Sequence, residues 1–369
     1  MTQLQMLAVG YAFFLGLIAV EAAVSHVRRD GYYNLGELVV NIGHGVVYQV
    51  VDYATKHLVV LPFAALSLWV PWEVLPMSAP WAWVLGFLVY DLSSYWSHRH
   101  HHEVHALWAI HGVHHAAEDF NFAAALRQPA LQGFTGWLWR LPLALVMPAR
   151  MFAILVVVDF LYQFVLHTRY VGKLGPLEWV LNTPSHHRVH HGRDADYLDC
   201  NYGGMLIVWD RLFGTFREEA EEPRYGLTKP LHTLNAVWGN LAIFGELWRA
   251  SSHVRPTDTW AVWLRGPEAL ARLAPAYAYV PPPRPTPERR SSPLRSYVFV
   301  SAALVPPLLA WMLLVGDGWG LALRGGMSAW IVWSVVAAGA LLENRRWVLP
   351  LEAFRWGLGL TLVIAAIAA

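Results

Sequence analysis

The sequence predicts an all-α fold, a polytopic membrane helical bundle that carries a histidine-rich helical cap. Only 14% of its 369 residues are charged and 56% are hydrophobic, whereas about 25% of residues are charged in a typical soluble domain. Apolar runs recur along the chain, and several approach the roughly 20 residues that a membrane-spanning helix needs. Thirteen of the 18 histidines lie between residues 98 and 191, which sets one histidine-rich region apart from the apolar helices.

The apolar runs are the first elements of this fold. The expected spans are residues 4–24, 36–54, 81–97, 297–315, 327–342 and 354–369. Three further runs are short or interrupted by proline, so a re-entrant loop, a hairpin or an interfacial helix all remain open for residues 57–71, 137–148 and 151–167. No basic stretch precedes the first run and no small-residue cleavage site follows it, so we expect a retained anchor rather than a signal peptide.

The chain divides into four portions by composition. Residues 1–80 are expected to form amino-terminal membrane helices, and residues 81–220 carry the histidines. Residues 221–296 are expected to be a polar, proline-rich cytosolic connector, and residues 297–369 a carboxy-terminal membrane bundle. The net charge of +1 gives no electrostatic basis for a nucleic-acid partner. The single cysteine, Cys200, excludes an internal disulfide and is expected to be a small loop residue.

Basic residues indicate the orientation of the bundle. Lys and Arg gather in the segments that carry or adjoin the histidines, at Arg28, Arg29, Arg127, Arg169, Lys173, Arg188, Arg193, Arg211, Arg217 and Arg224. Because cytoplasmic loops carry an excess of Lys and Arg, we expect the histidine-rich cap on the cytosolic face.

The histidines recur at spacings of three and four residues. Residues at these spacings are neighbours on a helix surface, and histidine is the commonest metal ligand among side chains. The candidate ligands are His98, His102, His111, His114, His115, His167, His187, His190 and His191. Eight or nine imidazoles are too many for one ion and suit two, so the cap is predicted to hold a dimetal site.

Three choices stay open at this point. His98 and His102 could instead be a solvated helix end. His101 and His105 share their spacing, and His186 competes with His187 as the first ligand of its cluster.

Acidic residues near the histidines are candidate partners of the ligands. A ligating imidazole usually donates its other N–H to a carboxylate or a carbonyl. Asp91 lies seven residues before His98 inside an expected span, where an unpaired acid is costly, so we expect it to orient a ligand. Asp159, eight residues before His167, is a similar candidate. The nearby acids Glu103, Asp194, Asp199 and Asp210 fit salt-bridge or capping roles equally well.

The number of ligands bears on the metal. Imidazole binds zinc, copper, iron and nickel, so ligand type does not choose between them. Two tetrahedral zinc ions with open positions would need only about six protein ligands. Eight or nine ligands favour two ions of higher coordination number, and iron is the natural one for oxygen chemistry.

Several motifs resemble the fatty acid hydroxylase/sterol desaturase superfamily over about residues 85–235. They are His98-Arg-x-x-His102-Glu103, Leu107-Trp-x-x-His111-x-x-His114-His115 and Asn182-Thr-Pro-Ser-His-His187-Arg-Val-His190-His191-Gly192. Asn201-Tyr-Gly-Gly204 and Trp209-Asp-Arg-Leu-Phe-Gly-Thr-Phe216 extend the resemblance. Gln163-Phe-Val-Leu-His167-Thr, Gly175-Pro-Leu-Glu178 and Tyr225-Gly-Leu-Thr228 most resemble the alkylglycerol monooxygenase branch of the superfamily.

The resemblance implies a membrane-bound non-haem di-iron oxygenase that uses O2 to hydroxylate a lipid C–H bond. On the branch named above, the attacked carbon adjoins the ether oxygen of an alkylglycerol, and tetrahydrobiopterin is the electron donor. Elsewhere in the superfamily the activity is that of a sterol or fatty-acid desaturase or hydroxylase, with a redox protein as donor. The family's pattern implies the candidate histidines as iron ligands, with His167 as the ninth and Gln163 where some relatives carry a tenth. Glu103 matches an acid that supports a ligand or contacts the cosubstrate.

Two other classes remain as alternatives. A membrane metal transporter or sensor would also bind ions through histidines, but it would need ionisable residues in several helices across the bilayer. A zinc hydrolase would need an acidic general base within its motif, as in His-Glu-x-x-His, and that string is absent. Analysis of the bound metal separates the three classes.

Overall fold

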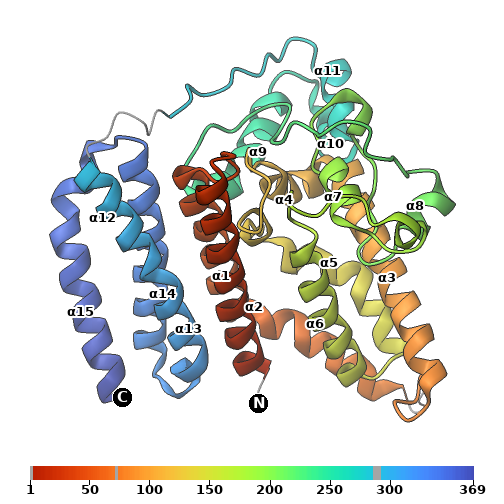
Figure 1. Ribbon diagram of the computed structural model, residues 1–369, viewed down its shortest axis with the longest axis horizontal. Coiled ribbons are helices and arrows are strands. Elements are labelled where there is room, and N and C mark those ends of the chain that lie inside the picture. Colours follow the sequence, from red (N-terminus) through yellow and green to blue (C-terminus); the bar gives the residue numbers. More distant parts are fainter. Residues whose placement is uncertain (1–2, 71–73, 286–291) are drawn as a thin grey trace.

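The computed structural model describes residues 3–70, 74–285 and 292–369, and within them the fold is all-α (Figure 1). The amino-terminal helices are α1 (Gln3–Arg28), α2 (Leu35–Trp69) and α3 (Pro80–Glu103). The carboxy-terminal helices are α12 (Ser292–Ala303), α13 (Val305–Val315), α14 (Leu321–Leu342) and α15 (Glu352–Ala368), with the 3₁₀ turns η8 (Gly316–Gly318) and η9 (Arg346–Leu351). The only extended pairings among the described residues are two isolated bridges, Leu181 with Leu206 and Gly192 with Tyr225.

The carboxy-terminal helices are the membrane-spanning part by length and hydropathy. Three stretches are long and apolar enough to cross a bilayer: Pro293–Gly318, Leu321–Leu342 and Arg346–Ala368. No other helix in the described ranges meets both criteria. The spans expected from the first half of the chain do form the long helices α1, α2 and α3. Polar side chains such as Asn41, His44 and Asp91 interrupt the apolar surface of α2 and α3 and are buried inside the protein.

The three ambiguous runs take different forms. Residues 57–69 continue α2, which runs through Pro62. Residues 132–165 form α5 (Gln132–Arg140), η2 (Leu141–Leu145) and α6 (Ala149–Val165), because Pro142 and Pro148 end or begin each piece. The helix α6 packs on α3 through a core that includes Tyr90, Met151 and Leu155.

A cap of short helices lies over one end of the long helices (Figure 1). It contains α4 (His105–His115), η1 (Ala124–Leu126), η3 (Gly175–Trp179), α7 (Pro184–His190), η4 (Ala195–Tyr197) and α8 (Val208–Phe213). Helices this short are unstable in isolation, so their packing against one another and on the long helices must stabilise them.

The expectation of a polar connector at residues 221–296 was wrong for its middle part. That part folds into α9 (Ala236–Ser251), η5 (Pro256–Asp258), α10 (Thr259–Leu264), η6 (Pro267–Ala269) and α11 (Leu270–Leu273). Its apolar residues Ile243 and Leu247 form a core with Ala109 of α4. The polar side chains Asn240 and Glu246 lie on the buried face of α9, which is why its composition did not indicate a packed helix. Part of the proline-rich tract, residues 286–291, lies outside the described residues.

Candidate metal centre

The first ligand candidates meet at the corner between α3 and α4. His98 and His102 occupy the last turns of α3, and Val104 then takes an extended conformation that turns the chain into α4. The last turn of α4 carries His111, His114 and His115. The Nε2 atoms of His98 and His111 lie 3.0 Å apart, so the corner brings the first two clusters into contact.

The remaining candidates come from the end of α6 and from α7. His167 lies just beyond α6, and its Nε2 lies 3.1 Å from Nε2 of His187. His190 and His191 end α7 one turn after His187. Segments far apart in the sequence therefore present their imidazoles to one region of the cap.

The nine predicted histidines form two groups. One group contains His98, His102, His111, His115 and His190, and the other contains His114, His167, His187 and His191. Within each group, one nitrogen from every residue lies within 4.8 Å of all the others. The groups are adjacent, since the rings of His115 and His191 stack with centroids 4.3 Å apart. Because α4 and α7 each contribute to both groups, the arrangement fits a dimetal site.

The competing candidates lie outside both groups. His101 bonds to the Ser97 carbonyl through Nδ1 (2.6 Å) and to the Thr135 hydroxyl through Nε2 (2.8 Å). The ring of His186 meets Phe216 edge-on at 5.4 Å. Of the ligand sets that the sequence left open, the one that converges in the structure therefore contains His98, His102 and His187.

Backbone carbonyls fix the tautomers of four ligand candidates. Nδ1 of each ring lies within hydrogen-bond distance of a carbonyl oxygen, in the pairs His98–Tyr202 (2.9 Å), His114–Arg127 (3.1 Å), His167–Gln163 (2.8 Å) and His190–Cys200 (2.9 Å). A carbonyl can only accept, so each Nδ1 carries the proton and donates it. In a neutral ring, Nε2 is then an unprotonated lone pair that is free to bind a metal ion.

Burial keeps these imidazoles neutral. It lowers the pKa of His114 to about 4. It also lowers the pKa values of His187, His190 and His191 well below the ordinary value, with the neighbouring histidines as a further cause. Neutral imidazole is the form that binds metal.

The ring nitrogens of the two groups are placed to bind a cation rather than to hydrogen-bond to one another. The Nε2 lone pairs of His114 and His167 face each other at 3.3 Å, and two acceptors at this distance repel unless a proton or a metal ion lies between them. Five further buried ring nitrogens have no hydrogen-bond partner: His102 Nε2, His111 Nδ1, His187 Nδ1, His190 Nε2 and His191 Nε2. Each unsatisfied buried polar atom costs about 1–3 kcal/mol, and metal coordination would remove this cost for the nitrogens that serve as ligands.

Comparison with known proteins agrees with this centre. Residues 83–215, which include the nine histidines, match the family model described as "Fatty acid hydroxylase". We call these residues the hydroxylase domain after this match, which confirms the resemblance predicted from the motifs.

Curated relatives cover more of the chain than the hydroxylase domain itself. The chain is 39% identical to alkylglycerol monooxygenase of Danio rerio over 241 residues (64% of this chain, 53% of that protein) and 40% identical to that of Homo sapiens over 228 residues (61% and 51%). It is 31% identical to an ornithine lipid hydroxylase of Rhizobium tropici over 142 residues (36% and 41%). The chain spans about half the length of the alkylglycerol monooxygenases that it matches. No solved structure matches it.

Asp91, which we expected to orient a ligand, bonds to a loop rather than to a histidine. Its carboxylate accepts hydrogen bonds from the backbone N–H groups of Met205 (2.9 Å) and Leu206 (3.1 Å) and from the Trp209 indole (2.9 Å). Seven residues of helix rise about 10 Å, so Asp91 lies too far below His98 for contact. In the hydroxylase domain Asp91 instead anchors the loop that provides the Tyr202 carbonyl.

A second acid, Asp210, holds the same loop from the other side. Its carboxylate accepts from the N–H groups of Tyr202 (2.7 Å) and Gly203 (2.8 Å). A Cβ atom at Gly203 would lie 2.4 Å from the Leu206 carbonyl oxygen, so only glycine fits there. The Asn201-Tyr-Gly-Gly204 motif of the hydroxylase domain is therefore a tight loop that orients His98.

The other predicted acids divide between structural and surface roles. Asp159 accepts from the Tyr90 hydroxyl (3.0 Å) and the Gln163 amide (2.8 Å), and neither Asp159 nor Gln163 belongs to a histidine group. Glu103 is exposed and pairs with Arg99 at 2.8 Å, the salt-bridge role left open by the sequence. The acid nearest a ligand candidate in the hydroxylase domain is Asp199, whose Oδ1 lies 3.5 Å from His102 Nδ1.

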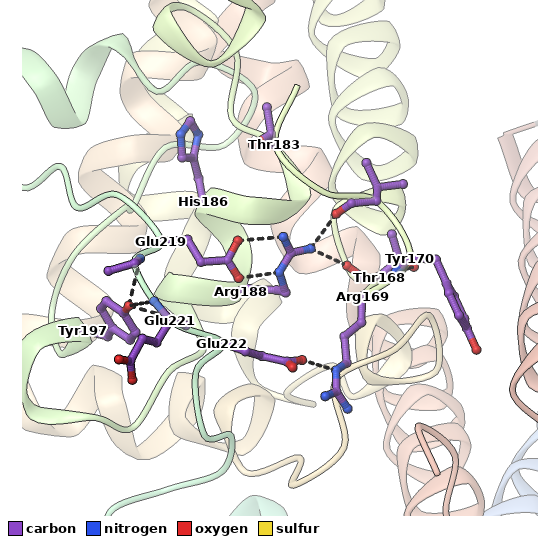
Figure 2. Close-up of polar contacts among 12 residues, drawn as sticks. Thr168, Arg169, Tyr170, Thr183, His186, Arg188, Tyr197, Glu219, Glu221 and Glu222 are labelled. Carbon is purple, nitrogen blue, oxygen red and sulfur yellow. Dashed lines mark hydrogen bonds and ion pairs between the residues drawn. The ribbon is translucent and has the colours of Figure 1, made fainter. Parts of the chain in front are cut away.

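Arg188, inside the third histidine motif, holds two ligand segments together and was missed from the sequence. Its guanidinium donates two hydrogen bonds to Glu219 (2.6 and 2.7 Å). It also donates to the carbonyls of Thr168 (3.0 Å) and Val171 (2.7 Å) (Figure 2). Arg188 therefore ties the segment that follows His167 to α7, which carries His187 and ends at His191 of the same group.

An acidic segment, residues 218–222, completes this connection. Glu222 pairs with Arg169, and Glu218 pairs with Lys173 at 2.6 Å. The Tyr197 hydroxyl accepts from the N–H groups of Ala220 (3.1 Å) and Glu221 (3.0 Å). Figure 2 shows Glu219 reaching toward Arg188 and Glu222 reaching toward Arg169. The sequence showed the negative charge of residues 218–222 but not which basic residues pair with them.

Proposed function

We propose that the protein is a membrane-bound non-haem di-iron oxygenase that hydroxylates a C–H bond of a lipid with O2. The observation that carries the proposal is the pair of adjacent groups of buried, neutral histidines. Nine imidazoles exceed what two tetrahedral zinc ions need, and their number and type suit iron. The family match of residues 83–215 supports an oxidoreductase of this kind.

The protein's own residues would hold, orient and shield the two ions. Five histidines would bind one ion and four the other, with the carbonyls of Tyr202, Arg127, Gln163 and Cys200 fixing the rings. Bound iron would supply the activation of O2. The burial of the ligand histidines would keep bulk water away from the reacting lipid carbon.

We further propose an alkylglycerol as the substrate, attacked at the carbon next to the ether oxygen. The support is the 39–40% identity to proteins named alkylglycerol monooxygenase. Hydroxylation at that carbon gives a hemiacetal, which breaks down to an aldehyde and glycerol. Tetrahydrobiopterin is the proposed electron donor, and the basic residues beside the histidines favour a cytosolic site. A hydroxylase of another lipid is the second candidate, favoured by the similarity to an ornithine lipid hydroxylase.

The decisive experiment uses the full chain in lipid nanodiscs, loaded with iron. We expect an alkylglycerol, O2 and tetrahydrobiopterin to yield a fatty aldehyde and glycerol, and we expect two irons per chain. The matched control substrate is the ester analogue of the same chain length, which lacks the ether oxygen. Turnover of an ornithine lipid instead would support the second candidate. Zinc alone together with hydrolytic turnover would contradict both candidates.

A further inference from the structure

The helix α9 exposes large apolar side chains, unlike a helix that faces only water. Its exposed residues include Trp238 (48% exposed), Leu241 (46%) and Trp248 (77%). At 3.6 residues per turn these three positions lie within an arc of about 80°, so they form one stripe. The buried face opposite the stripe carries Asn240 and Glu246.

The polar residues on the buried face are satisfied inside the protein. Asn240 accepts from the Ala130 N–H (2.8 Å) and donates to the Ala236 carbonyl (2.8 Å). Glu246 accepts from the Lys229 ammonium at 2.8 Å. The exposure of the stripe is therefore a property of the packed helix, because rotating α9 about its axis would bury the stripe and break these contacts.

Contacts at its first turn place α9 at the end of a membrane-spanning helix. The Leu234 carbonyl, just before α9, packs on Gly339 so closely that a Cβ there would lie 2.2 Å from its oxygen. Gly339 lies three residues, or about 4.5 Å of rise, before the end of α14, and α14 is long and apolar enough to cross a bilayer. In Figure 1, α9 lies at the level at which α1 ends and α12 begins.

We propose that α9 lies in the interface of the bilayer that α14 spans, with the Trp238–Leu241–Trp248 stripe facing lipid. Tryptophan is enriched at the boundary between hydrocarbon and headgroups, and an exposed apolar stripe on a folded protein marks a contact surface. The stripe lies on a helix that begins beside the end of α14, and the exposed Arg249 beside Trp248 suits anionic headgroups. The occupant is therefore the lipid of the surrounding membrane.

This placement has a consequence for the histidine groups. The helix α9 packs directly on α4, where a Cβ at Gly112 would lie 2.8 Å from the Ile243 side chain. The ligand-bearing helix α4 thus rests on a helix seated in the membrane, which fixes the height of the histidine groups above the hydrocarbon. The membrane contact itself does not depend on the proposed reaction.

The test measures the depth of nitroxide labels in the full chain, reconstituted in nanodiscs of phosphatidylcholine and phosphatidylglycerol. The variants are Leu241→Cys, Trp238→Cys and Trp248→Cys, and the matched control is Asp196→Cys, an exposed polar position on the cap. The native Cys200 is buried, and the labelled unsubstituted chain provides its background. Variants that elute as a single species and bind metal like the unsubstituted chain are compared.

We expect O2 to relax the labels on α9 severalfold more effectively, relative to a water-soluble nickel chelate, than the label at position 196. A nickel accessibility at positions 238 and 241 equal to that at 196 would overturn the proposal, because the stripe would then face water. Protection of the α9 labels from both O2 and nickel would also overturn it, since a protein partner or a second copy would then cover the stripe.

Discussion

At the scale of single residues, the centre depends on which ring nitrogen carries the proton. Four backbone carbonyls hold Nδ1 protons and leave Nε2 lone pairs turned inward, including the facing pair of His114 and His167. Two such lone pairs at 3.3 Å favour a bound cation. Metal binding and the orientation of the rings therefore depend on each other. The loss of one ligand should weaken metal binding by its own group more than metal binding by the other group.

Replacement of His190 by alanine should abolish metal loading of the five-histidine group and turnover with it. His167→Ala is the matched variant, and it should empty the four-histidine group first. Metal analysis and iron spectroscopy of the two purified variants check this expectation. A His190→Ala protein that binds metal and turns over like the unsubstituted chain would remove His190 from the ligands.

The metal-free protein should become less stable as the pH falls from about 6.5 toward 4. Burial lowers the pKa of His114 from the ordinary 6.5 to about 4 and also lowers the pKa values of His187 and His190 well below 6.5. The unfolded chain then binds more protons than the folded chain within this window, so the free energy of unfolding rises with pH and is lost on acidification. Thermal unfolding of the metal-free protein in detergent at pH 7.5 and 5.5 measures the effect.

The metal-loaded protein provides the control for the pH experiment. Bound ions hold the histidines deprotonated, so its unfolding temperature should change less between the two pH values until the metal dissociates. An equal pH dependence of the loaded and metal-free forms would contradict the assignment of these histidines as ligands.

At the scale of elements, helical spacing predicted most of the candidate ligands but not what holds them. The i, i+3 and i+4 patterns identified eight histidines, His167 was a single further candidate, and the structure gathers all nine into two groups. The sequence could not choose between His98 and His101 as the first ligand, because both begin a pair four residues apart and only the corner at Val104 decides which side faces α4. Backbone carbonyl partners such as those of Tyr202 and Cys200 carry no side-chain signal at all.

The same limits apply to the predicted acids. A seven-residue spacing put Asp91 about 10 Å from His98 along α3, and the motif that singled out Glu103 could not show its exposed pair with Arg99. The helix α9 was missed because its polar residues are turned inward and its tryptophans outward.

The bidentate pair of Arg188 and Glu219 should control metal affinity at the four-histidine group. Arg188→Lys keeps the charge but cannot hold Glu219 and two carbonyls at once. Loss of a residue that orients ligands typically costs about 10–100-fold in metal affinity, and we expect a loss of this size for Arg188→Lys and a smaller one for Glu219→Gln. Metal titration with a competing chelator measures both.

The exposed pair of Lys173 and Glu218, on the same acidic segment, is the matched control for Arg188. Exposed ion pairs contribute about 0–1 kcal/mol, so Glu218→Gln should leave metal affinity almost unchanged. A loss of affinity in Glu218→Gln as large as that in Arg188→Lys would mean that the whole segment acts through its charge rather than through the contacts of Arg188.

At the scale of the whole molecule, the two halves of the chain have different relations to the metal centre. The carboxy-terminal helices are the ones that satisfy the criteria for spanning a membrane. The amino-terminal helices α1 and α2 extend polar side chains toward the loops of the centre: Glu21 accepts from Thr168, the residue after His167, and Glu37 pairs with Arg127 at 3.2 Å. The amino-terminal helices and the ligand candidates are thus linked by buried and partly buried charges.

The link through Arg127 is the most direct. Its carbonyl orients His114, while its buried guanidinium donates to Glu37, to Asn41 of α2 (3.1 Å) and to the Val113 carbonyl (3.0 Å). Removing one partner of a buried ion pair leaves an uncompensated charge and costs about 3–5 kcal/mol. Glu37→Gln should therefore lower the unfolding temperature and displace the Arg127 carbonyl from His114.

We expect Glu37→Gln to weaken metal binding at the four-histidine group by about tenfold and to leave the five-histidine group loaded. Glu103→Gln is the control, because its surface pair with Arg99 lies outside both groups and contributes about 0.3–0.5 kcal/mol. Chelator titration with iron spectroscopy separates the two groups. If Glu103→Gln lost metal or activity and Glu37→Gln did not, the centre would be supported from the end of α3 rather than from α2.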